Sequence, residues 1–287
     1  MIVITGATGQ LGHAVVLALL KSVPASEISL SVRDPQKASD LAQRGVRVRR
    51  GDFSDPGSLG AAFEGAAQVL MVSSNARAYG GDPLAQHASA IEAARGAGVR
   101  RIVYTSQIAA SPTSAFAPAV DHAATEELLR RSGLAWTSLR NGFYASSGVA
   151  FMGDSPETGL LEAPADGPVA WAAHADLAEA AAIILASPGR YEGPTPPLTG
   201  SQALDLADLA AIASELGRPV RRSVFPDEEL GAKLEAQGRP SGAARFLLGQ
   251  YLASRGGEFG PVNPALGELI GHPPITMREL IAARLSR

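Results

Sequence analysis

The segment Ile2-Val3-Ile4-Thr5-Gly6-Ala7-Thr8-Gly9-Gln10-Leu11-Gly12 decides the fold of this chain. Residues with high strand propensity come first, a glycine-rich turn follows, and the apolar stretch 14–20 predicts a helix. This order is typical of a dinucleotide-binding domain, in which N–H groups of the turn face a pyrophosphate. The alternative is a tight strand–helix turn without a ligand. The residues predicted to contact the cofactor are Gly6, Ala7, Thr8, Gly9, Gln10, Leu11 and Gly12.

Strand and helix patterns alternate after this segment. Strands are expected at 2–5, 27–32, 46–49, 68–73, 101–106 and 135–140. Helices are expected at 34–44, 56–64, 83–95 and 121–131. Six strands joined by helices and short turns predict an α/β fold, a Rossmann-type doubly wound parallel sheet.

The second half of the chain has a different pattern. Prolines and glycines gather in 153–168 and 187–200, which predicts loops or a lid rather than regular layers. A helix is expected to begin at Asp176 as its N-cap, with further helices at 205–216, 227–236, 243–253 and 276–285 and a strand at 220–225. We therefore expect a Rossmann NAD(P)-binding domain over 1–150 and a smaller C-terminal α/β substrate lobe over 151–287, partly interleaved with the sheet.

Composition excludes several classes of function. The net charge of −3 and the isoelectric point near 6.0 argue against nucleic-acid or membrane partners. The chain has no cysteine, so disulfides, thiol catalysis and thiolate metal sites are excluded, and no metal is expected. No targeting pattern or apolar run of spanning length is present, which predicts a cytoplasmic protein. The sequence leaves a homodimer open.

Arg33 ends the second expected strand, 21 positions after Gly12. An NAD site places a carboxylate about there for the ribose 2′-OH, whereas an arginine suits the 2′-phosphate of NADPH. Arg33 therefore predicts NADPH, although the adjacent Asp34 complicates the interpretation unless it starts the next helix. The alternative is a solvated surface arginine.

The other strand ends provide the remaining cofactor candidates, because ligands of open α/β sheets bind beyond the carboxyl ends of the strands. Two of these strand ends have an alternative without a ligand. Asn141-Gly142 has the composition of a simple turn, and Asp52-Phe53, after the third strand, has that of an ordinary polar turn. The candidates are Asp52, Phe53, Ser73, Ser74, Asn75, Thr105, Ser106, Arg140, Asn141, Gly142, Phe143 and Tyr144.

These motifs resemble one known family. The glycine turn, Arg33, Ser73–Asn75 and the stretch 139–144 are similar to those of NmrA-like atypical short-chain dehydrogenases/reductases, in the branch of bacterial NAD(P)H:quinone and triphenylmethane reductases. The similarity extends to Leu269-Ile270-Gly271-His272-Pro273. It implies a Rossmann fold, bound NADPH and reduction of a quinone or a similar small conjugated acceptor.

The chain lacks the Tyr-x-x-x-Lys pair of most short-chain dehydrogenases, in which lysine lowers the pKa of the tyrosine. The residues four positions after the five tyrosines are Pro83, Ile108, Gly148, Thr195 and Arg255. Alcohol oxidation or sugar epimerisation by that pair is therefore not expected.

We assign the catalytic positions as His122, Asn141 and Tyr144. Related NmrA-like reductases have a lysine at the start of the helix after the fifth strand, and the resemblance places His122 there. His122 is expected to supply a proton near neutral pH, and Phe143 to wall the acceptor pocket. The alternative for His122 is a surface histidine paired with Glu126 one helical turn later.

Two other functions are compatible with the sequence. A missing Tyr–Lys pair also fits a non-catalytic regulator that senses NAD(P), as some NmrA-like proteins do. A reductase of dyes or of other conjugated carbonyls is the second alternative. The loops 111–118 and 146–168 would distinguish the acceptors, but they contain no pattern that identifies one.

Overall fold

A computed structural model of the chain describes residues 1–236, 238 and 242–286. Two units share the chain in an interleaved order. The first contains Met1–Gln107, Asp121–Arg140 and His174–Pro196, and the second contains Ile108–Val120, Asn141–Ala173 and Pro197–Arg287. The boundary at residue 150 stays a prediction. Within the described ranges, no helix is long and apolar enough to cross a membrane.

The first unit is built on a seven-stranded parallel sheet in the order β3-β2-β1-β4-β5-β6-β9. Its strands are β1 (Ile2–Thr5), β2 (Ile28–Val32), β3 (Arg47–Arg50), β4 (Gln68–Met71), β5 (Arg101–Gln107), β6 (Ala135–Asn141) and β9 (Gly193–Pro194). The order reverses between β1 and β4, as the doubly wound fold requires. The predicted fold is confirmed, with β9 as a seventh, two-residue strand.

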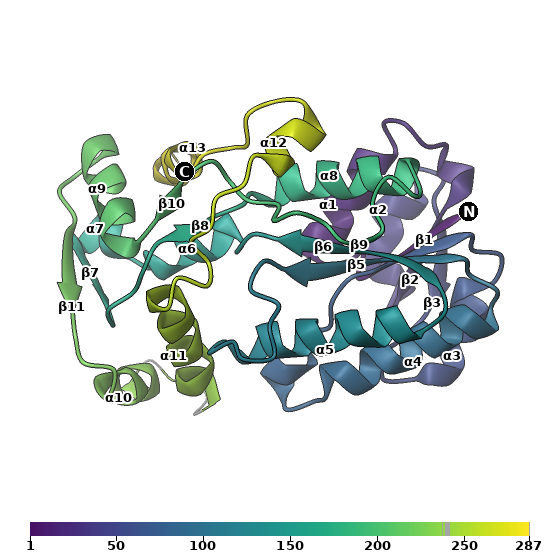
Figure 1. The fold of residues 1–287 in the computed structure, drawn as a ribbon. Coiled ribbons are helices and arrows are strands. Elements are labelled where there is room, and N and C mark those ends of the chain that lie inside the picture. Colours follow the sequence, from purple (N-terminus) through teal and green to yellow (C-terminus); the bar gives the residue numbers. More distant parts are fainter. Residues whose placement is uncertain (237, 239–241, 287) are drawn as a thin grey trace. The chain divides into compact units, whose positions relative to one another are not determined.

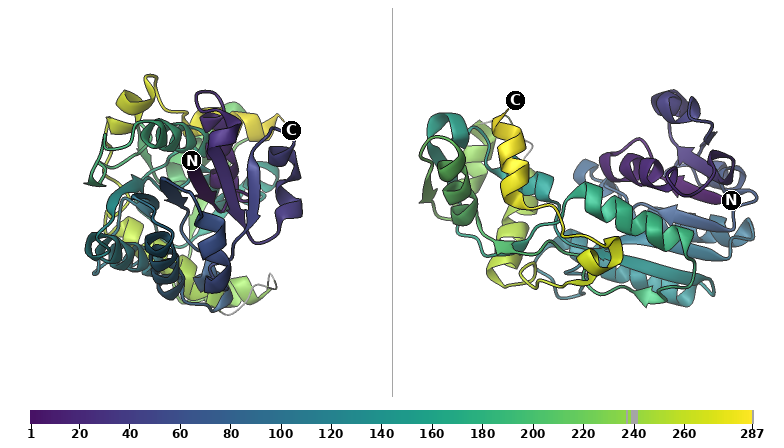
Figure 2. Two further views of the ribbon diagram at one scale, coloured as in Figure 1. Left: turned by 90° about the vertical axis from the view of Figure 1, so that its right-hand side faces the viewer. Right: turned by 90° about the horizontal axis from the view of Figure 1, so that it is seen from above.

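Helices cover both faces of this sheet (Figure 1). The helical segments are α1 (Gln10–Leu19), η1 (Ala25–Glu27), η2 (Pro35–Ala38), α2 (Ser39–Ala42), α3 (Pro56–Phe63), η3 (Ala76–Tyr79), α4 (Pro83–Gly96), α5 (Ala117–Arg131) and α8 (His174–Ala186). Helices α3, α4 and α5 lie on one face, and α1 packs beside α8 on the other, as the view from above in Figure 2 also shows.

Apolar strands hold this arrangement together. All four residues of β1 are buried, and Val3 pairs with Val69 of β4 in register. Strands buried on both faces are near-continuous apolar runs, which is why this sheet could be predicted. Phe63 of α3 and Tyr104 of β5 are fully buried in the core that α3 and α4 form with the sheet.

The second unit has short strands and helices around its own apolar core. Its strands are β7 (Leu160–Ala163), β8 (Val169–Ala170), β10 (Ala203–Leu204) and β11 (Arg221–Val224), and its helices are α6 (Ala145–Phe151), α7 (Ser155–Thr158), α9 (Leu206–Leu216), α10 (Glu229–Ala236), α11 (Gly242–Arg255), α12 (Ala265–Ile270) and α13 (Met277–Leu285). β7 pairs with β11 in parallel and β8 with β10 in antiparallel. Reciprocal capping boxes start α9 at Asp205 and α13 at Thr276.

Three local predictions were wrong. The expected helix 34–44 is divided into η2 and α2, with Pro35 in the first turn of η2. Asp176 is not an N-cap, because α8 begins at His174 and the Asp176 carboxylate is buried within its first turn. The segment 153–168 contains α7 and β7 rather than only loop, because β7 finds its partner about 60 residues away in β11.

Candidate functional site

The glycine turn has the geometry that an anion site needs. Gly6 has a φ of 62°, and a Cβ on Gly12 would lie 2.3 Å from the Gly6 carbonyl oxygen, so glycine is required at both positions. Gly9, the N-cap of α1, offers no side-chain cap, and the first turn has no acidic residue. The first N–H groups and positive end of α1 therefore fit a pyrophosphate.

Side chains fix the backbone that follows β4. The N–H groups of residues 72–74 donate in order to Thr5 Oγ1 at 2.9 Å, Thr105 Oγ1 at 2.8 Å and His87 Nε2 at 2.9 Å. These bonds tie the predicted Ser73–Asn75 segment to β1, β5 and α4. The Thr105 hydroxyl is thus engaged with backbone, and Ser73 and Thr105 lie side by side at 3.3 Å between their hydroxyl oxygens.

His87 is a residue of this site that the sequence did not reveal. Its side chain is buried, and its second nitrogen, Nδ1, lies 2.8 Å from Thr125 Oγ1. Because Nε2 accepts from Ser74, the neutral ring carries its proton on Nδ1 and donates to Thr125. Burial lowers the pKa of His87 to about 3, with a smaller contribution from His122. The ring is therefore a neutral linker between α4, α5 and the loop.

Arg33 and Asp34 have separate roles in the loop after β2. Arg33 is exposed. The Asp34 carboxylate is turned to its own chain, where it accepts a hydrogen bond from Gln36 N at 3.1 Å and caps η2. Asp34 thus starts the next helical segment, which is the condition under which Arg33 predicts NADPH.

Asp52 and Phe53 form the turn after β3. The Asp52 carboxylate accepts from Ser54 N at 2.9 Å, which is the ordinary polar-turn arrangement. Phe53 is half-buried and meets His87 edge-on at 6.4 Å between ring centroids. Their predicted contact with the adenine stays a prediction.

A buried carboxylate on α5, that of Glu126, joins the strands β5 and β6. Glu126 Oε1 accepts from Ser106 Oγ and Ser138 Oγ, each at 2.8 Å, and Arg140 Nη2 donates to Glu126 Oε2 at 2.7 Å. Glu126 is only 8% exposed, so its charge needs these partners. Ser106 and Arg140 therefore act here as partners of Glu126, a hub that sequence reasoning did not identify.

His122 does not pair with Glu126, contrary to the surface alternative. Its Nδ1 lies 2.7 Å from the hydroxyl of Tyr104, on β5. Burial lowers the pKa of His122 to about 4, and the carboxylates of Asp121 and Glu126 oppose this shift only in part. This lowered pKa favours the neutral ring at pH 7, and the expected catalytic role of His122 stays a prediction.

The predicted residues of the second unit begin at Asn141, the last residue of β6, and continue directly after it. Gly142 N donates to Leu198 O at 2.7 Å, and a Cβ on Gly142 would lie 2.9 Å from the Ala170 carbonyl oxygen. Burial raises the pKa of Tyr144, and a side-chain hydrogen bond with Asn141 partly opposes this rise. Asn141 Oδ1 is buried without a hydrogen-bond partner among the described residues.

Aromatic rings surround Phe143 in the second unit. Its ring centroid lies 5.7 Å from Phe116, 5.0 Å from Phe259 and 5.7 Å from Trp171. Phe246 on α11 extends this cluster through an edge contact with Phe116 at 5.2 Å and is 43% exposed. Phe116, Phe259 and Trp171 are buried in the core of the second unit, so Phe246 is the exposed end of this cluster.

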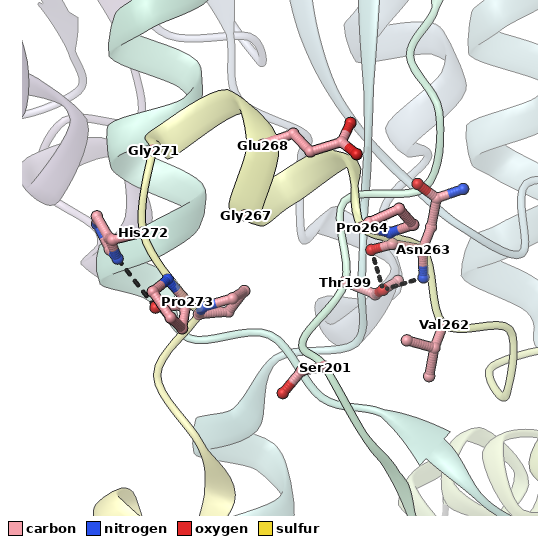
Figure 3. Close-up of a pocket in the computed structure, with 11 residues that line it drawn as sticks. Thr199, Ser201, Val262, Asn263, Pro264, Gly267, Glu268, Gly271, His272 and Pro273 are labelled. Carbon is pink, nitrogen blue, oxygen red and sulfur yellow. Dashed lines mark hydrogen bonds between the residues drawn. The ribbon is translucent and has the colours of Figure 1, made fainter.

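The second unit also contains an open cleft of about 670 Å³ beside α12 (Figure 3). Its wall is mainly apolar, and Thr199 Oγ1 accepts from Asn263 N at 2.9 Å. The lining residues are Thr199, Ser201, Val262, Asn263, Pro264, Gly267, Glu268, Gly271, His272, Pro273 and Pro274. Every predicted catalytic or cofactor residue lies outside this set. Among the described residues, no group of three His, Asp or Glu side chains could hold a metal ion.

Comparison with known proteins identifies the family. The profile of an NAD(P)H-binding family matches residues 6–188. Quinone oxidoreductase 2 of Escherichia coli (strain K12) is 40% identical over 285 residues, which cover 98% of each chain. The chain belongs to this NAD(P)H-binding family, and its resemblance to NmrA-like reductases is confirmed.

Two solved structures extend the similarity to the fold. An Escherichia coli NADPH-dependent quinone oxidoreductase complexed with NADPH matches with a TM-score of 0.92 and 38% identity over the whole of both chains. Citrobacter sp. triphenylmethane reductase complexed with NADP(H) matches with a TM-score of 0.88 and 34% identity over 99% of each chain.

Proposed function

We propose that this chain is an NADPH-dependent reductase that transfers a hydride to a quinone or a similar conjugated acceptor. The observation that carries the proposal is the full-length similarity to quinone oxidoreductase 2. Bound NADPH supplies the hydride, so that NADPH, one proton and a quinone give NADP⁺ and a hydroquinone. The missing Tyr–Lys pair agrees with this reaction, because the hydroquinone oxyanion is stable without a strong general acid.

Cofactor binding is assigned to the first unit. The turn Gly6–Gly12 would hold the pyrophosphate with backbone N–H groups, as its uncapped helix start allows. Arg33 would bind the 2′-phosphate, because Asp34 caps η2 rather than presenting a carboxylate for a ribose hydroxyl. The ordered segment 72–74 would support the cofactor between these positions and the acceptor.

Three side chains are assigned to the acceptor. Asn141 and Tyr144 form a hydrogen-bonded pair in the second unit, and the buried Asn141 Oδ1 can still accept a bond. His122, in the first unit, would donate a hydrogen bond as a neutral imidazole to the oxygen on which charge develops. The final proton would come from solvent, because the lowered pKa of His122 leaves little imidazolium at neutral pH.

The aromatic cluster supports a flat acceptor. Phe143 follows Asn141 by two residues and contacts Phe116, which in turn contacts the exposed Phe246. Aromatic side chains favour planar rings through offset or edge-on contact. Benzoquinones, naphthoquinones and dye molecules share this shape, so dye reduction remains the alternative activity, which the similarity to triphenylmethane reductase favours.

Two assays on the purified full chain test the proposal and distinguish it from a sensor. NADPH binding is measured by titration, and NADPH oxidation is measured with benzoquinone, menadione and a triarylmethane dye. The proposal expects binding together with rapid oxidation in the presence of a quinone. Tight binding with no oxidation by any acceptor would support a sensor, and oxidation with the dye alone would support dye reduction.

A further inference from the structure

The contact between Tyr104 and His122 joins a core strand to the helix that presents the histidine. Tyr104 is fully buried on β5, and its hydroxyl lies 2.7 Å from His122 Nδ1. The two ring centroids are 5.7 Å apart. His122 itself is only partly buried. Because Nδ1 is bound to the core, Nε2 is the nitrogen that can contact a substrate.

The chemistry of the two groups favours one direction for this bond. A phenol O–H is a strong donor, and a neutral imidazole nitrogen is a strong acceptor. If Tyr104 donates to Nδ1, the imidazole proton resides on Nε2. The opposite arrangement would place the proton on Nδ1 and direct a bare Nε2 lone pair outward, where it would repel a developing oxyanion.

The charged groups around His122 are already paired. On its own helix, Asp121 accepts hydrogen bonds from Nε and Nη2 of Arg77, each at 2.6 Å, and Glu126 is bound by Arg140. From α4, His87 lies beside Tyr104 with 5.3 Å between ring centroids, and its lowered pKa keeps it neutral. No carboxylate in these contacts competes with Tyr104 for Nδ1, so the tyrosine determines the tautomer.

We propose that Tyr104 is a positioning residue that holds His122 in the tautomer with the proton on Nε2, so that His122 presents a hydrogen-bond donor to the acceptor oxygen. This inference rests on the proposed function for the role of His122. The tautomer itself is a property of the free protein and can be measured without turnover.

Nitrogen-15 NMR of the full chain labelled at histidine tests the tautomer directly at pH 7. The His122 signals are assigned by their loss in His122→Gln. We expect a protonated Nε2 and an unprotonated Nδ1 in the wild type, and a mixture of tautomers in Tyr104→Phe. Tyr191→Phe, which removes a phenolic hydroxyl elsewhere in the same unit, is the control and should give the wild-type spectrum. A wild-type Nδ1 that carries the proton, or an unchanged Tyr104→Phe spectrum, would overturn the proposal.

The pH dependence of turnover provides a second test, because a role of Tyr104 in packing alone would leave the pH profile unchanged. A hydroxyl that donates to Nδ1 stabilises the neutral ring, so Tyr104→Phe should raise the pKa of His122 and move the acid limb of the kcat profile to higher pH. The opposite bond direction predicts a shift to lower pH, which contradicts the proposal. We also expect kcat to fall roughly tenfold, with the KM for NADPH unchanged.

The two assignments fail in different ways. If His122→Gln retains full turnover, the catalytic role of His122 is wrong whatever the NMR result. If His122→Gln loses turnover while Tyr104→Phe changes neither the tautomer nor the kcat profile, only the role of Tyr104 is wrong. Tyr104→Phe keeps the ring that packs in the core, so circular dichroism should show an unchanged fold.

Discussion

The backbone N–H of Ser74 donates to the imidazole of His87 across 2.9 Å, inside the protein and 13 residues away along the chain. Because Thr125 occupies the other ring nitrogen, the histidine must be neutral for both bonds to form as they stand. Protonation of His87 therefore competes directly with the native position of the loop after β4.

Stability should fall as this histidine gains its proton. The pKa of His87 is about 3 in the folded chain, below its ordinary 6.5, so the unfolded state binds more protons between these values. Stability is fully present above pH 6.5 and is lost as the pH falls, by up to about 1.4 kcal/mol per pH unit for each such histidine. His122 shifts in the same direction.

Denaturant titrations between pH 7 and 5 measure this effect, since the folded-state pKa values of both histidines lie below that range. We expect the wild-type free energy of unfolding to decrease with pH and the decrease to be smaller in His87→Gln. An identical pH dependence in the two proteins would contradict the neutral-linker role of His87.

Arg33→Glu should weaken NADPH binding strongly. The exposed guanidinium would be replaced by a carboxylate that repels the 2′-phosphate, and the dissociation constant should rise roughly 10- to 100-fold. Affinity for NADH, which lacks that phosphate, should change little. Arg44→Glu makes the same charge change at another exposed arginine nearby in sequence and is the control. If both variants weaken NADPH binding equally, general electrostatics rather than Arg33 explains the effect.

Glu126→Ala should destabilise the fold, because it leaves Arg140 without its partner and removes the acceptor of two buried hydroxyls. Breaking a buried ion pair costs about 3–5 kcal/mol. The adjacent Glu127→Ala is a matched control, since Glu127 pairs with Arg130 at the surface and its loss should hardly change the free energy of unfolding. Chemical denaturation of both variants measures the free energy of unfolding. Equal values for the two variants would contradict the role of Glu126 as a shared buried partner.

Phe246→Ala should change the preference among acceptors. Losing the exposed ring of the aromatic cluster should lower kcat/KM for a two-ring naphthoquinone roughly tenfold relative to a one-ring benzoquinone. Leu252→Ala is the control, because Leu252 lies on the same helix and is also 43% exposed. A parallel decrease in both variants would place the acceptor away from the cluster.

The sequence was sufficient for the parts of the fold that depend on local pattern. The strand and glycine turn at 2–12 could be predicted because apolar residues and glycines with fixed spacing specify them. The interpretation of Asp34 as the start of a helical segment was confirmed for the same reason, since a cap acts over two residues.

Contacts between distant residues were beyond the sequence. The sequence identified His87 only as a histidine in an expected helix. Its role as a neutral linker depends on contacts with Ser74 and with Thr125, which lies 38 residues further along the chain. Glu126 has the spacing of a partner for His122, but buried hydroxyls and Arg140 bind it instead. Strand β7 was not predicted, because β11, the strand with which it pairs in the described sheet, lies far from it in the sequence.

The central claim is best tested by mixing NADPH, the full chain and a limiting amount of menadione without oxygen, and measuring both products. The proposed function predicts that one NADPH is oxidised for each hydroquinone formed, and that His122→Gln and Asn141→Ala both slow the reaction. No NADPH oxidation, or wild-type turnover in both variants, would contradict it.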